Sequence, residues 1–372
     1  MKSAGRRTES TGQVDFILLV IILAMLLFGF VMLFSASSPE ASESGILRAL
    51  MKQFIIAGVG LAAMIMAVAY DYHNYKRKSK AIITAMMIVM IAVPIFGFAS
   101  HGATRQISLG FISFQPSEFA KIAIVIYYAT RYSDKKNQNL TTDKKNIIVS
   151  FGFMLAFCAT CILQKHMSAA IILALISIMM MLVAGFSIKL TILGGSLLAV
   201  VGSIFIFTEE YRANRILALF KPFEYKRGIG WQIVQSLFAV GSGGLFGLGL
   251  GQSRQKYQYL PEVQNDYIYA VICEELGFIG GIAVIALFVL FVWRGMSIAL
   301  NAKDRFGMLM AFGITSIVGL QMLINIGVVL SILPSTGMQL PLFSSGGSSM
   351  LATLWGMGIL LNISKSSKVK KI

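Results

Sequence analysis

Long apolar segments separated by short polar ones recur from Phe16 to Ile363. A helix needs about 20 mostly apolar residues to cross the hydrocarbon core of a bilayer. Segments of this kind lie at 16–34, 53–70, 81–99, 117–131, 147–163, 168–186, 189–207, 262–293, 306–333 and 346–363. The pattern predicts an all-α polytopic membrane protein with about ten transmembrane helices. Because no soluble-looking block interrupts it, we expect one membrane domain over residues 1–372.

Composition and charge placement narrow the class of protein. Of 372 residues, 56% are hydrophobic and 13% are charged, values that a soluble domain cannot reconcile with a polar surface. In a soluble protein the net charge of +16 would suggest a nucleic-acid partner. Here the basic residues concentrate in alternate inter-helix segments rather than on one face interleaved with aromatic residues. We therefore expect no nucleic acid.

The same basic residues predict the orientation, because loops rich in Lys and Arg stay on the cytoplasmic side. With the N-terminus inside, clusters such as Lys76-Arg77-Lys78 and Lys144-Lys145 are cytoplasmic. The tail at 1–15 and the basic tail at 364–372 are then both cytoplasmic. The segment 208–266, between the seventh and eighth helices, becomes a large extracytoplasmic loop.

This loop is the connection long enough to hold a site of its own, and such loops are often functional. Apolar residues at helical spacing around Trp231 predict an amphipathic helix inside it. That helix could lie in the outer interface of the membrane or pack onto the bundle.

Two carboxylates stand where the loop meets the eighth helix. Pro261 suits the first position of a helix, and a helix beginning there would place Glu262 and Asp266 one turn apart on one face. Neighbouring carboxylates raise each other's proton affinity, so one of them could act as a general base. Alternatively, Glu262 is a favourable anion at a helix N-terminus and Asp266 a solvated cap.

Further charges fall inside apolar segments. Glu118 and Lys121, three residues apart in the fourth helix, are most simply an ion pair that faces the bundle interior. The pair could brace the fold, line a substrate cavity, or do both. Glu274 and Glu275 lie about two turns beyond Asp266, and one of them should face a cavity or a basic residue.

Basic residues outside the membrane are candidates for binding phosphate. Arg105 follows flexible residues on the outer side and could bind phosphate or anchor to lipid headgroups. The glycine-rich run 241–251 precedes Arg254 and Lys256; it could cradle a lipid-linked diphosphate or form a tight re-entrant turn. No metal-ligand cluster or dinucleotide motif appears.

Seven stretches occur in order along the chain: GATRQISLG at 102–110, FQPSEFAK at 114–121, GSGGLFGLGLGQSRQK at 241–256, YLPEVQNDYIYAVICEELGFIGG at 259–281, NIGVV at 325–329, LPSTGMQLP at 333–341 and SSGGSS at 344–349. Together they resemble the SEDS family (shape, elongation, division and sporulation) of bacterial membrane glycosyltransferases. The stretch GLGQSRQK at 249–256, followed by YLPE at 259–262, is more similar to the division branch, FtsW, or its sporulation relative than to the elongation branch, RodA.

The resemblance implies a peptidoglycan glycosyltransferase that polymerises lipid II at the outer face of the cytoplasmic membrane. Asp266 occupies the position of the family's essential extracytoplasmic aspartate. Glu262, Arg105, Glu118 and Lys121 occupy positions that the family uses at or near its cavity. Where the family often has Trp and an acidic residue, this chain has Gln106 and the loop Gln164-Lys165-His166-Met167-Ser168, so no role is assigned to His166.

On this hypothesis Asp266 removes the proton from the acceptor sugar's 4-hydroxyl, which attacks the anomeric carbon of the growing strand with inversion. The leaving group is a polyprenyl diphosphate. Arg105 with Arg254 or Lys256 would offset its charge, and a divalent metal, Mg or Mn, could assist although the sequence does not demonstrate one.

The resemblance also implies partners and a place in the cell. We expect lipid II, the nascent glycan strand, a class B penicillin-binding protein that acts as single-pass transpeptidase, and other division proteins, at the septum. Two other classes of function are a lipid II flippase or transporter, suggested by intramembrane Glu118 and Lys121, and a divisome scaffold for the transpeptidase.

Overall fold

The structure is a computed structural model of the chain. It describes residues 12–37, 43–96, 98–100, 103–108, 113–133, 143–196, 210–225, 228, 230–257, 260 and 263–367. The helices are α1 (Phe16–Ser37), α2 (Glu43–Ala69), α3 (His73–Phe96), α4 (Pro116–Ser133), α5 (Lys144–Leu163), α6 (Met167–Ala184), α8 (Glu210–Phe220), α9 (Trp231–Ser242), α10 (Ile268–Leu300), α11 (Arg305–Val329) and α12 (Gly347–Ser366). Residues 188–196 are also helical.

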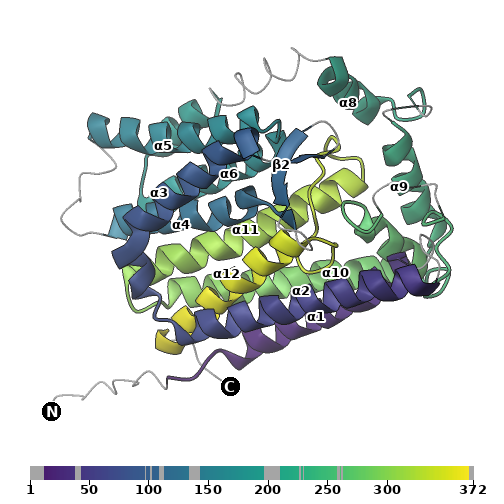
Figure 1. Cartoon of the computed structure of the whole chain (residues 1–372), viewed down its shortest axis with the longest axis horizontal. Coiled ribbons are helices and arrows are strands. Elements are labelled where there is room, and N and C mark those ends of the chain that lie inside the picture. The colour runs from purple at the N-terminus through teal and green to yellow at the C-terminus, as the bar shows by residue number, and fades with distance from the viewer. Residues whose placement is uncertain are drawn as a thin grey trace.

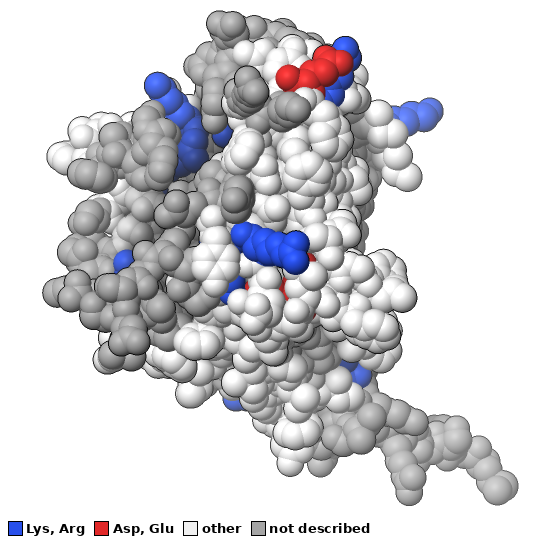
Figure 2. All heavy atoms as spheres, turned by 90° about the vertical axis from the view of Figure 1, so that its right-hand side faces the viewer, with Lys and Arg blue, Asp and Glu red and all other residues white. Residues whose placement is uncertain are grey.

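The long helices form one bundle, with α1, α2, α10 and α12 along one side and α3, α4, α5 and α6 along the other (Figure 1). Helices α8 and α9 lie at one end of the bundle, and both chain termini lie toward the opposite end. Helices α8 and α9 therefore lie away from the first turn of α1 and the last turn of α12; the membrane face on which each end lies stays a prediction. Charged side chains are sparse among the described residues of the end that carries α8 and α9 (Figure 2).

Seven helices are long and apolar enough to cross a membrane: α1, residues 51–69 of α2, α3, α5, α6, α10 and α11. The chain is therefore a multi-pass membrane protein. Two further expected spans form α4 and α12, but the charges of α4 and the small polar residues of α12 lower their apolarity. The expected span 189–207 lies mostly outside the described residues, so the count of ten stays a prediction.

Helix α10 is broken at Gly277, whose φ of 68° lies in the left-handed region that glycine adopts without a Cβ clash. The glycine-rich segment packs against this break: the Leu248 and Gly249 amides donate to the Glu274 and Glu275 carbonyls at 2.9 and 3.0 Å. The Phe278 amide returns a bond to the Gly244 carbonyl. Of the two alternatives for this segment, the tight turn describes the backbone.

Helix α9 confirms the amphipathic helix expected around Trp231. Its buried face includes Ile233 and Val234, it packs on α10 and α11, and the Ser236 hydroxyl donates to the Val329 carbonyl at 2.8 Å. Packing onto the bundle is therefore the observed arrangement. Phe238 points away and is about half exposed.

A small antiparallel sheet, absent from the expected all-α fold, connects α3 to α4. Its strands are β1 (Phe98–Ser100), β2 (Ala103–Ser108) and β3 (Ser113–Phe114), in the order β1-β2-β3. Residues Ile107 and Phe114 are paired across β2 and β3. The sheet carries Arg105 and Gln106 and sets their side chains on opposite faces, because side chains alternate along a strand.

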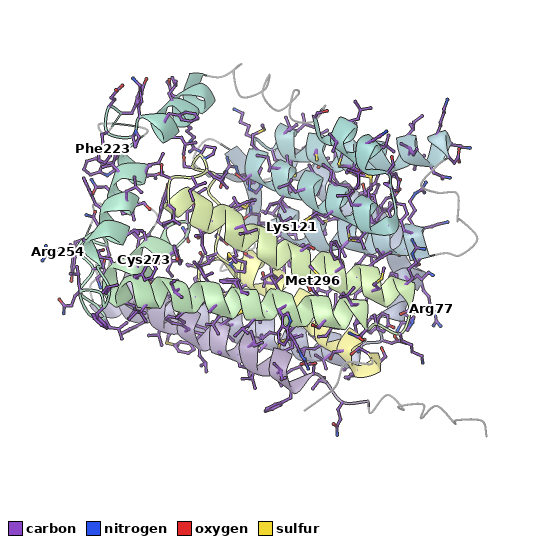
Figure 3. The ribbon with its side chains drawn as sticks, turned by 180° about the vertical axis from the view of Figure 1, so that it is seen from behind. Arg77, Lys121, Phe223, Arg254, Cys273 and Met296 are labelled. Atoms are coloured by element: carbon purple, nitrogen blue, oxygen red, sulfur yellow. The ribbon has the colours of Figure 1, made fainter. Side chains whose placement is uncertain are left out.

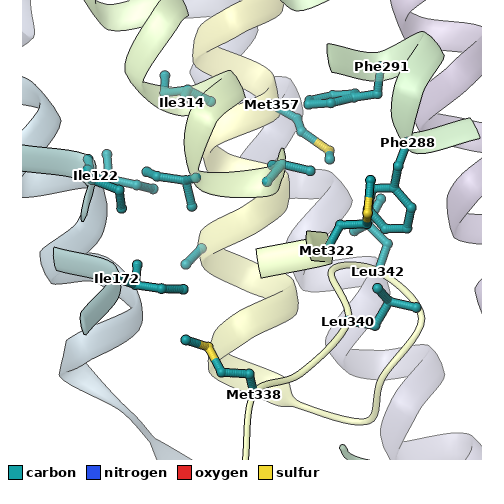
Figure 4. Close-up of a cluster of buried hydrophobic side chains, with 14 of the residues drawn as sticks. Ile122, Ile172, Phe288, Phe291, Ile314, Met322, Met338, Leu340, Leu342 and Met357 are labelled. Carbon is teal, nitrogen blue, oxygen red and sulfur yellow. The ribbon is translucent and has the colours of Figure 1, made fainter. Parts of the chain in front are cut away.

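The loop between α11 and α12 is held by the bundle core. Met338, Leu340 and Leu342 of this loop are buried and lie in one apolar cluster with Met322, Phe288 and Ile172 from three different helices (Figure 4). Truncating one such side chain in a close-packed core costs about 2–5 kcal/mol. The loop therefore offers a fixed backbone to the site that it borders.

Candidate functional site

A polar cavity of about 390 Å³ opens between α1, α2, the small sheet and the α11–α12 loop. Its walls carry amides, hydroxyls and one lysine: Ser37, Lys52, Gln53, Gln106, Ser113, Gln115, Gln264, Asn265, Gln339, Ser345, Ser348 and Ser349, together with Phe30, Leu33, Ile56, Gly346 and Gly347. Many uncharged donors and acceptors around one lysine suit a large, hydroxyl-rich ligand that also carries negative charge.

Asp266 lies directly beyond two of these wall residues, Gln264 and Asn265. It is not on a helix: α10 begins at Ile268, and residues 263–266 form turns. The prediction that a helix starts at Pro261 is therefore wrong. Glu262 and Pro261 lie outside the described residues, so the spacing of the two carboxylates stays a prediction.

Tertiary hydrogen bonds account for this turn. The Asn325 side-chain amide donates to the Asp266 carbonyl at 2.8 Å and to the Met338 carbonyl at 2.6 Å. The Ser345 amide donates to the Gln264 carbonyl at 2.8 Å. These bonds use carbonyls that a helix would otherwise employ, and they tie the aspartate to the α11–α12 loop.

Gly337 separates Asp266 from a second, smaller chamber. Its φ is +65°, and a Cβ placed on it would lie 3.4 Å from Asp266 Oδ2. Gly337 also lines a chamber of about 40 Å³, whose other walls are Gln115, Glu118, Lys121, His166, Ala169, Ile172, Gln321, Met338 and Gln339. Gln115 and Gln339 border both spaces, so the cavity and the chamber adjoin, and Asp266 lies beside Gly337 of the chamber wall.

Glu118 and Lys121 form the expected ion pair. Lys121 Nζ lies 2.6 Å from Glu118 Oε2, and their side chains are 5% and 14% exposed. Lys121 lies in the interior, between the ends marked by Arg77 and Arg254 (Figure 3). Both residues border the chamber, so the pair lines a cavity; whether it also braces the fold stays a prediction.

Arg105 approaches the same chamber from β2. Its guanidinium donates to the Lys165 carbonyl at 2.8 Å, which places it beside His166. The positive charges of Arg105 and Lys121 both act on His166. Two candidates from the sequence, Glu118 and Lys121, thus line the chamber, and Arg105 lies close to it, beside His166.

Lys256 is not part of this group. Its ammonium is fully buried and lies 3.1 Å from Glu275 Oε1, and it also donates to the Gly251 and Ser35 carbonyls at 2.8 and 3.1 Å. The expected cradle of Arg254 and Lys256 around a diphosphate is therefore corrected for Lys256, because protein oxygens already surround its charge. Glu275 does face a basic residue, as the sequence predicts.

Arg254 belongs to the same turn, but its side chain is exposed. Its amide donates to Glu274 Oε1 at 3.0 Å, and the Ser253 hydroxyl donates to Glu274 Oε2. Glu274 is thus bound by backbone and hydroxyl donors. A role for the Arg254 side chain toward substrate stays a prediction.

Lys52, Gln53 and Gln339 are wall residues that sequence reasoning missed. Lys52 carried a usable signal: a lysine at the outer end of a membrane helix departs from the preference for cytoplasmic positive charge. Gln53 and Gln339 carried no signal in the sequence, because they lie in segments far apart along the chain and meet at the cavity only in the folded structure.

Comparison with known proteins decides the family. The sequence model of the FtsW/RodA/SpoVE family, described as cell cycle protein, matches residues 16–369. The chain belongs to this family. The SEDS resemblance of the sequence motifs is thereby confirmed.

Curated relatives match along nearly their whole length. Stage V sporulation protein E of Bacillus subtilis (strain 168) is 38% identical over 360 residues, covering 95% of this chain and 98% of that protein. A protein of Trichlorobacter lovleyi named probable peptidoglycan glycosyltransferase FtsW is 37% identical over 370 residues, covering 98% of this chain and 96% of that protein.

Solved structures share the fold. One solved chain aligns with a TM-score of 0.81 at 24% identity, and the alignment covers 96% of this chain and 99% of that one. Its structure is described as "Structural coordination of polymerization and crosslinking by a peptidoglycan synthase complex". The rod shape determining protein RodA of Thermus thermophilus aligns with a TM-score of 0.72 at 23% identity, covering 96% and 98%.

Proposed function

We propose that this protein is a peptidoglycan glycosyltransferase that polymerises lipid II into glycan strands during cell division. The observation that carries the proposal is the position of the Asp266 carboxylate beside Gly337, in the wall of a charged inner chamber that adjoins a polar cavity of about 390 Å³. The names of the curated FtsW relatives support the same activity.

Asp266 is the general base of this proposal. It takes the proton from the acceptor sugar's 4-hydroxyl as that oxygen attacks the anomeric carbon of the donor strand, with inversion. The bond from the anomeric carbon to the polyprenyl diphosphate breaks at the same time, and the diphosphate leaves with the bonding electrons. Asn325 fixes the Asp266 backbone, which favours an orientation that is set before substrate binds.

Cations on either side of Asp266 would stabilise the departing diphosphate. Lys52 lines the cavity and Arg105 lies beside the chamber, whereas Arg254 acts from the exposed turn. Mg²⁺ in enzymes is often held by one or two carboxylates plus substrate phosphates, and Asp266 fits the protein share of such a site. A divalent cation, Mg or Mn, bound there would add charge neutralisation.

We further propose that the chain is one membrane domain with both termini in the cytoplasm and its cavity at the outer face of the bacterial cytoplasmic membrane, at the septum. The basic residues at the terminal end of the bundle support this orientation. Its partner would be a class B penicillin-binding protein, together with other division proteins; the similarity to a chain of a peptidoglycan synthase complex supports such an assembly.

The experiment is polymerisation of lipid II by the full chain in nanodiscs, alone and with the candidate transpeptidase, for wild type and Asp266→Asn. A general base contributes about 10²- to 10⁴-fold, so Asp266→Asn should lower kcat by that factor. Glu224→Gln is the matched control, because Glu224 is an exposed carboxylate of the same loop, paired with Lys221.

The rival functions give different results. A flippase makes no glycan chains in any mixture but moves lipid II across vesicles, and a scaffold makes none while still binding the transpeptidase. Full activity of Asp266→Asn would remove the base assignment while leaving the glycosyltransferase.

A further inference from the structure

His166 occupies the connection between α5 and α6, outside both helices, and is 6% exposed. Its amide donates to the Cys161 carbonyl at 2.8 Å, and its carbonyl accepts from the Ala170 amide at 3.2 Å. These bonds fix the backbone at the N-terminus of α6 without using the imidazole. The ring itself lines the inner chamber, where neither the predicted mechanism nor the sequence motifs give it a task.

The hydrogen bonds around the ring accommodate a tautomer that carries its proton on Nε2. Gln115 Nε2 donates to Ser117 Oγ at 3.3 Å, and Ser117 Oγ lies 3.3 Å from His166 Nδ1. A hydroxyl has one proton and two lone pairs, so Ser117 can accept from Gln115 and give its proton to Nδ1. Nδ1 is then an acceptor, and the N–H of the neutral ring is on Nε2.

Nε2 makes no hydrogen bond to the described residues, and the ring, in a side chain that is 6% exposed, lines the chamber. A polar atom at a cavity is available to a water or a ligand. The chamber of about 40 Å³ holds about two waters, or one hydroxyl or acetamido group. It opens beside Gly337, whose missing side chain leaves Asp266 and the chamber adjacent.

The surrounding charges keep the ring neutral. Burial, together with the nearby cations Arg105 and Lys121, lowers the pKa of His166 to about 3. Glu118 also borders the chamber, but its carboxylate is bound to Lys121 at 2.6 Å, and Asp266 stands on the other side of Gly337. The neutral ring can donate one hydrogen bond to an oxygen in the chamber without adding a further cation to those of Arg105 and Lys121.

We propose that His166 is a further substrate-binding residue: its Nε2–H donates a hydrogen bond to an uncharged oxygen, a hydroxyl or acetamido carbonyl, of the sugar that Asp266 activates. The proposal rests on the proposed glycosyltransferase function. His166 neither gives up nor takes up a proton in the reaction. It holds the sugar so that the reacting hydroxyl faces the aspartate.

The first test compares His166→Leu, which removes the donor, with His166→Gln, whose amide N–H lies near the position of Nε2–H. In nanodiscs, His166→Leu should raise the KM for lipid II about 10-fold and change kcat less than KM, while His166→Gln should stay within about 3-fold of wild type. His73→Gln is the matched control, because His73 pairs with Asp71 and Asp304 at the far end of the bundle. Equal loss in the Gln and Leu variants, with unchanged thermal stability, would overturn the proposal.

The second test measures binding without turnover. In an Asp266→Asn background, His166→Leu should weaken lipid II binding about 10-fold, and Ser117→Ala, which frees the ring to change tautomer, should weaken it less. Unchanged affinity in both would overturn the proposal. If lipid II binds and responds to His166 but wild type makes no glycan, the glycosyltransferase function fails while the binding role stands.

The third test reads the tautomer directly. The chain has three histidines, so ¹⁵N NMR of the labelled protein with His166→Gln as reference assigns the His166 signals. We expect a neutral ring protonated at Nε2 down to about pH 4, and a shift of the Nε2 signal on adding lipid II to the Asp266→Asn chain. A ring protonated at Nδ1, or one that lipid II leaves unaffected, would contradict the assignment.

Discussion

Two buried charged clusters, both close to Asp266 in sequence or in space, use their charges differently. In the first, the Lys256 ammonium is surrounded by the Glu275 carboxylate and two carbonyls, and Glu274 accepts from the turn that carries Arg254. In the second, Glu118 and Lys121 pair only with each other among the described side chains and border a chamber. Satisfied polar groups rigidify a fold, whereas groups beside a cavity retain capacity for a ligand.

The comparison separates charges that hold the break in α10 from charges that border the chamber. Sequence alone left two alternatives for Lys256, because a cation after a glycine-rich run can belong to a phosphate cradle or to a tight turn. The structure places it with the first kind, since the same glycines bring the turn onto Gly277 and bury the lysine against Glu275.

The largest expected effect concerns this first cluster. Lys256→Met leaves Glu275 as a buried charge without its cation, which should lower the free energy of unfolding by about 3–5 kcal/mol. The double variant Lys256→Met with Glu275→Leu should recover much of that loss, because the uncompensated charge is gone. Thermal unfolding in detergent, followed by tryptophan fluorescence, measures both.

The same variants test whether Lys256 has a structural role or contacts substrate. If Lys256→Met left stability unchanged but raised the KM for lipid II, then Lys256 would contact substrate as the sequence first suggested. A folded Lys256→Met chain with an unchanged KM at low temperature supports the structural role.

Lys52 gives the next largest effect, on binding rather than on stability. It is an exposed cavity residue, and a hydrogen bond to a charged group contributes about 1.5–3 kcal/mol. Lys52→Met should therefore raise the KM for lipid II about 10- to 100-fold and leave the unfolding temperature unchanged. The matched control is Lys221→Met, an exposed lysine in a surface pair with Glu224; an equal rise in KM for both lysines would assign the effect to overall charge.

The pH dependence of the free energy of unfolding tests whether the fold keeps His166 neutral. The pKa of His166 is about 3 in the folded protein and about 6.5 in an unfolded chain. Above pH 6.5 both states are neutral and nothing is lost. As the pH falls from 6.5 toward 3, the unfolded state binds a proton that the folded state does not, so stability falls by about 1.4 kcal/mol per pH unit, or about 2 kcal/mol at pH 5.

The measurement is the unfolding midpoint of wild type and His166→Gln between pH 5 and pH 8. The slope that His166 causes should disappear in the Gln variant and persist in His73→Gln. An identical slope in wild type and His166→Gln would mean that His166 is not held neutral by its surroundings.

Local sequence patterns predicted the local structure well. Apolar runs located the long helices, and the three-residue spacing of Glu118 and Lys121 predicted their ion pair, because neighbours on one helix face contact each other whatever the rest of the fold does. The amphipathic pattern around Trp231 likewise gave α9. The sequence motifs placed Arg105 and Lys121 near one another only through the family resemblance.

Contacts between distant segments could not be predicted. The helix expected from Pro261 begins at Ile268 because Asn325, 59 residues away, binds the Asp266 carbonyl. Lys256 is bound to Ser35, 221 residues away. The cavity that brings Lys52 to Gln339 likewise exists only after the helices have packed.

Arg254 should give the smallest effect, and it tests where the two clusters meet. Its amide serves the first cluster, while its exposed side chain is free to act on substrate only through solvent, where charges are strongly screened. Arg254→Ala should change the free energy of unfolding by less than about 0.5 kcal/mol. It should lower kcat/KM for lipid II about 2- to 3-fold at low salt. This loss of kcat/KM should vanish near 0.5 M salt, because the attraction is long-range and salt screens it. Polymerisation rates over a salt series measure it; a larger loss that survives high salt would show direct contact between Arg254 and the diphosphate, and would move this residue into the second class of charges.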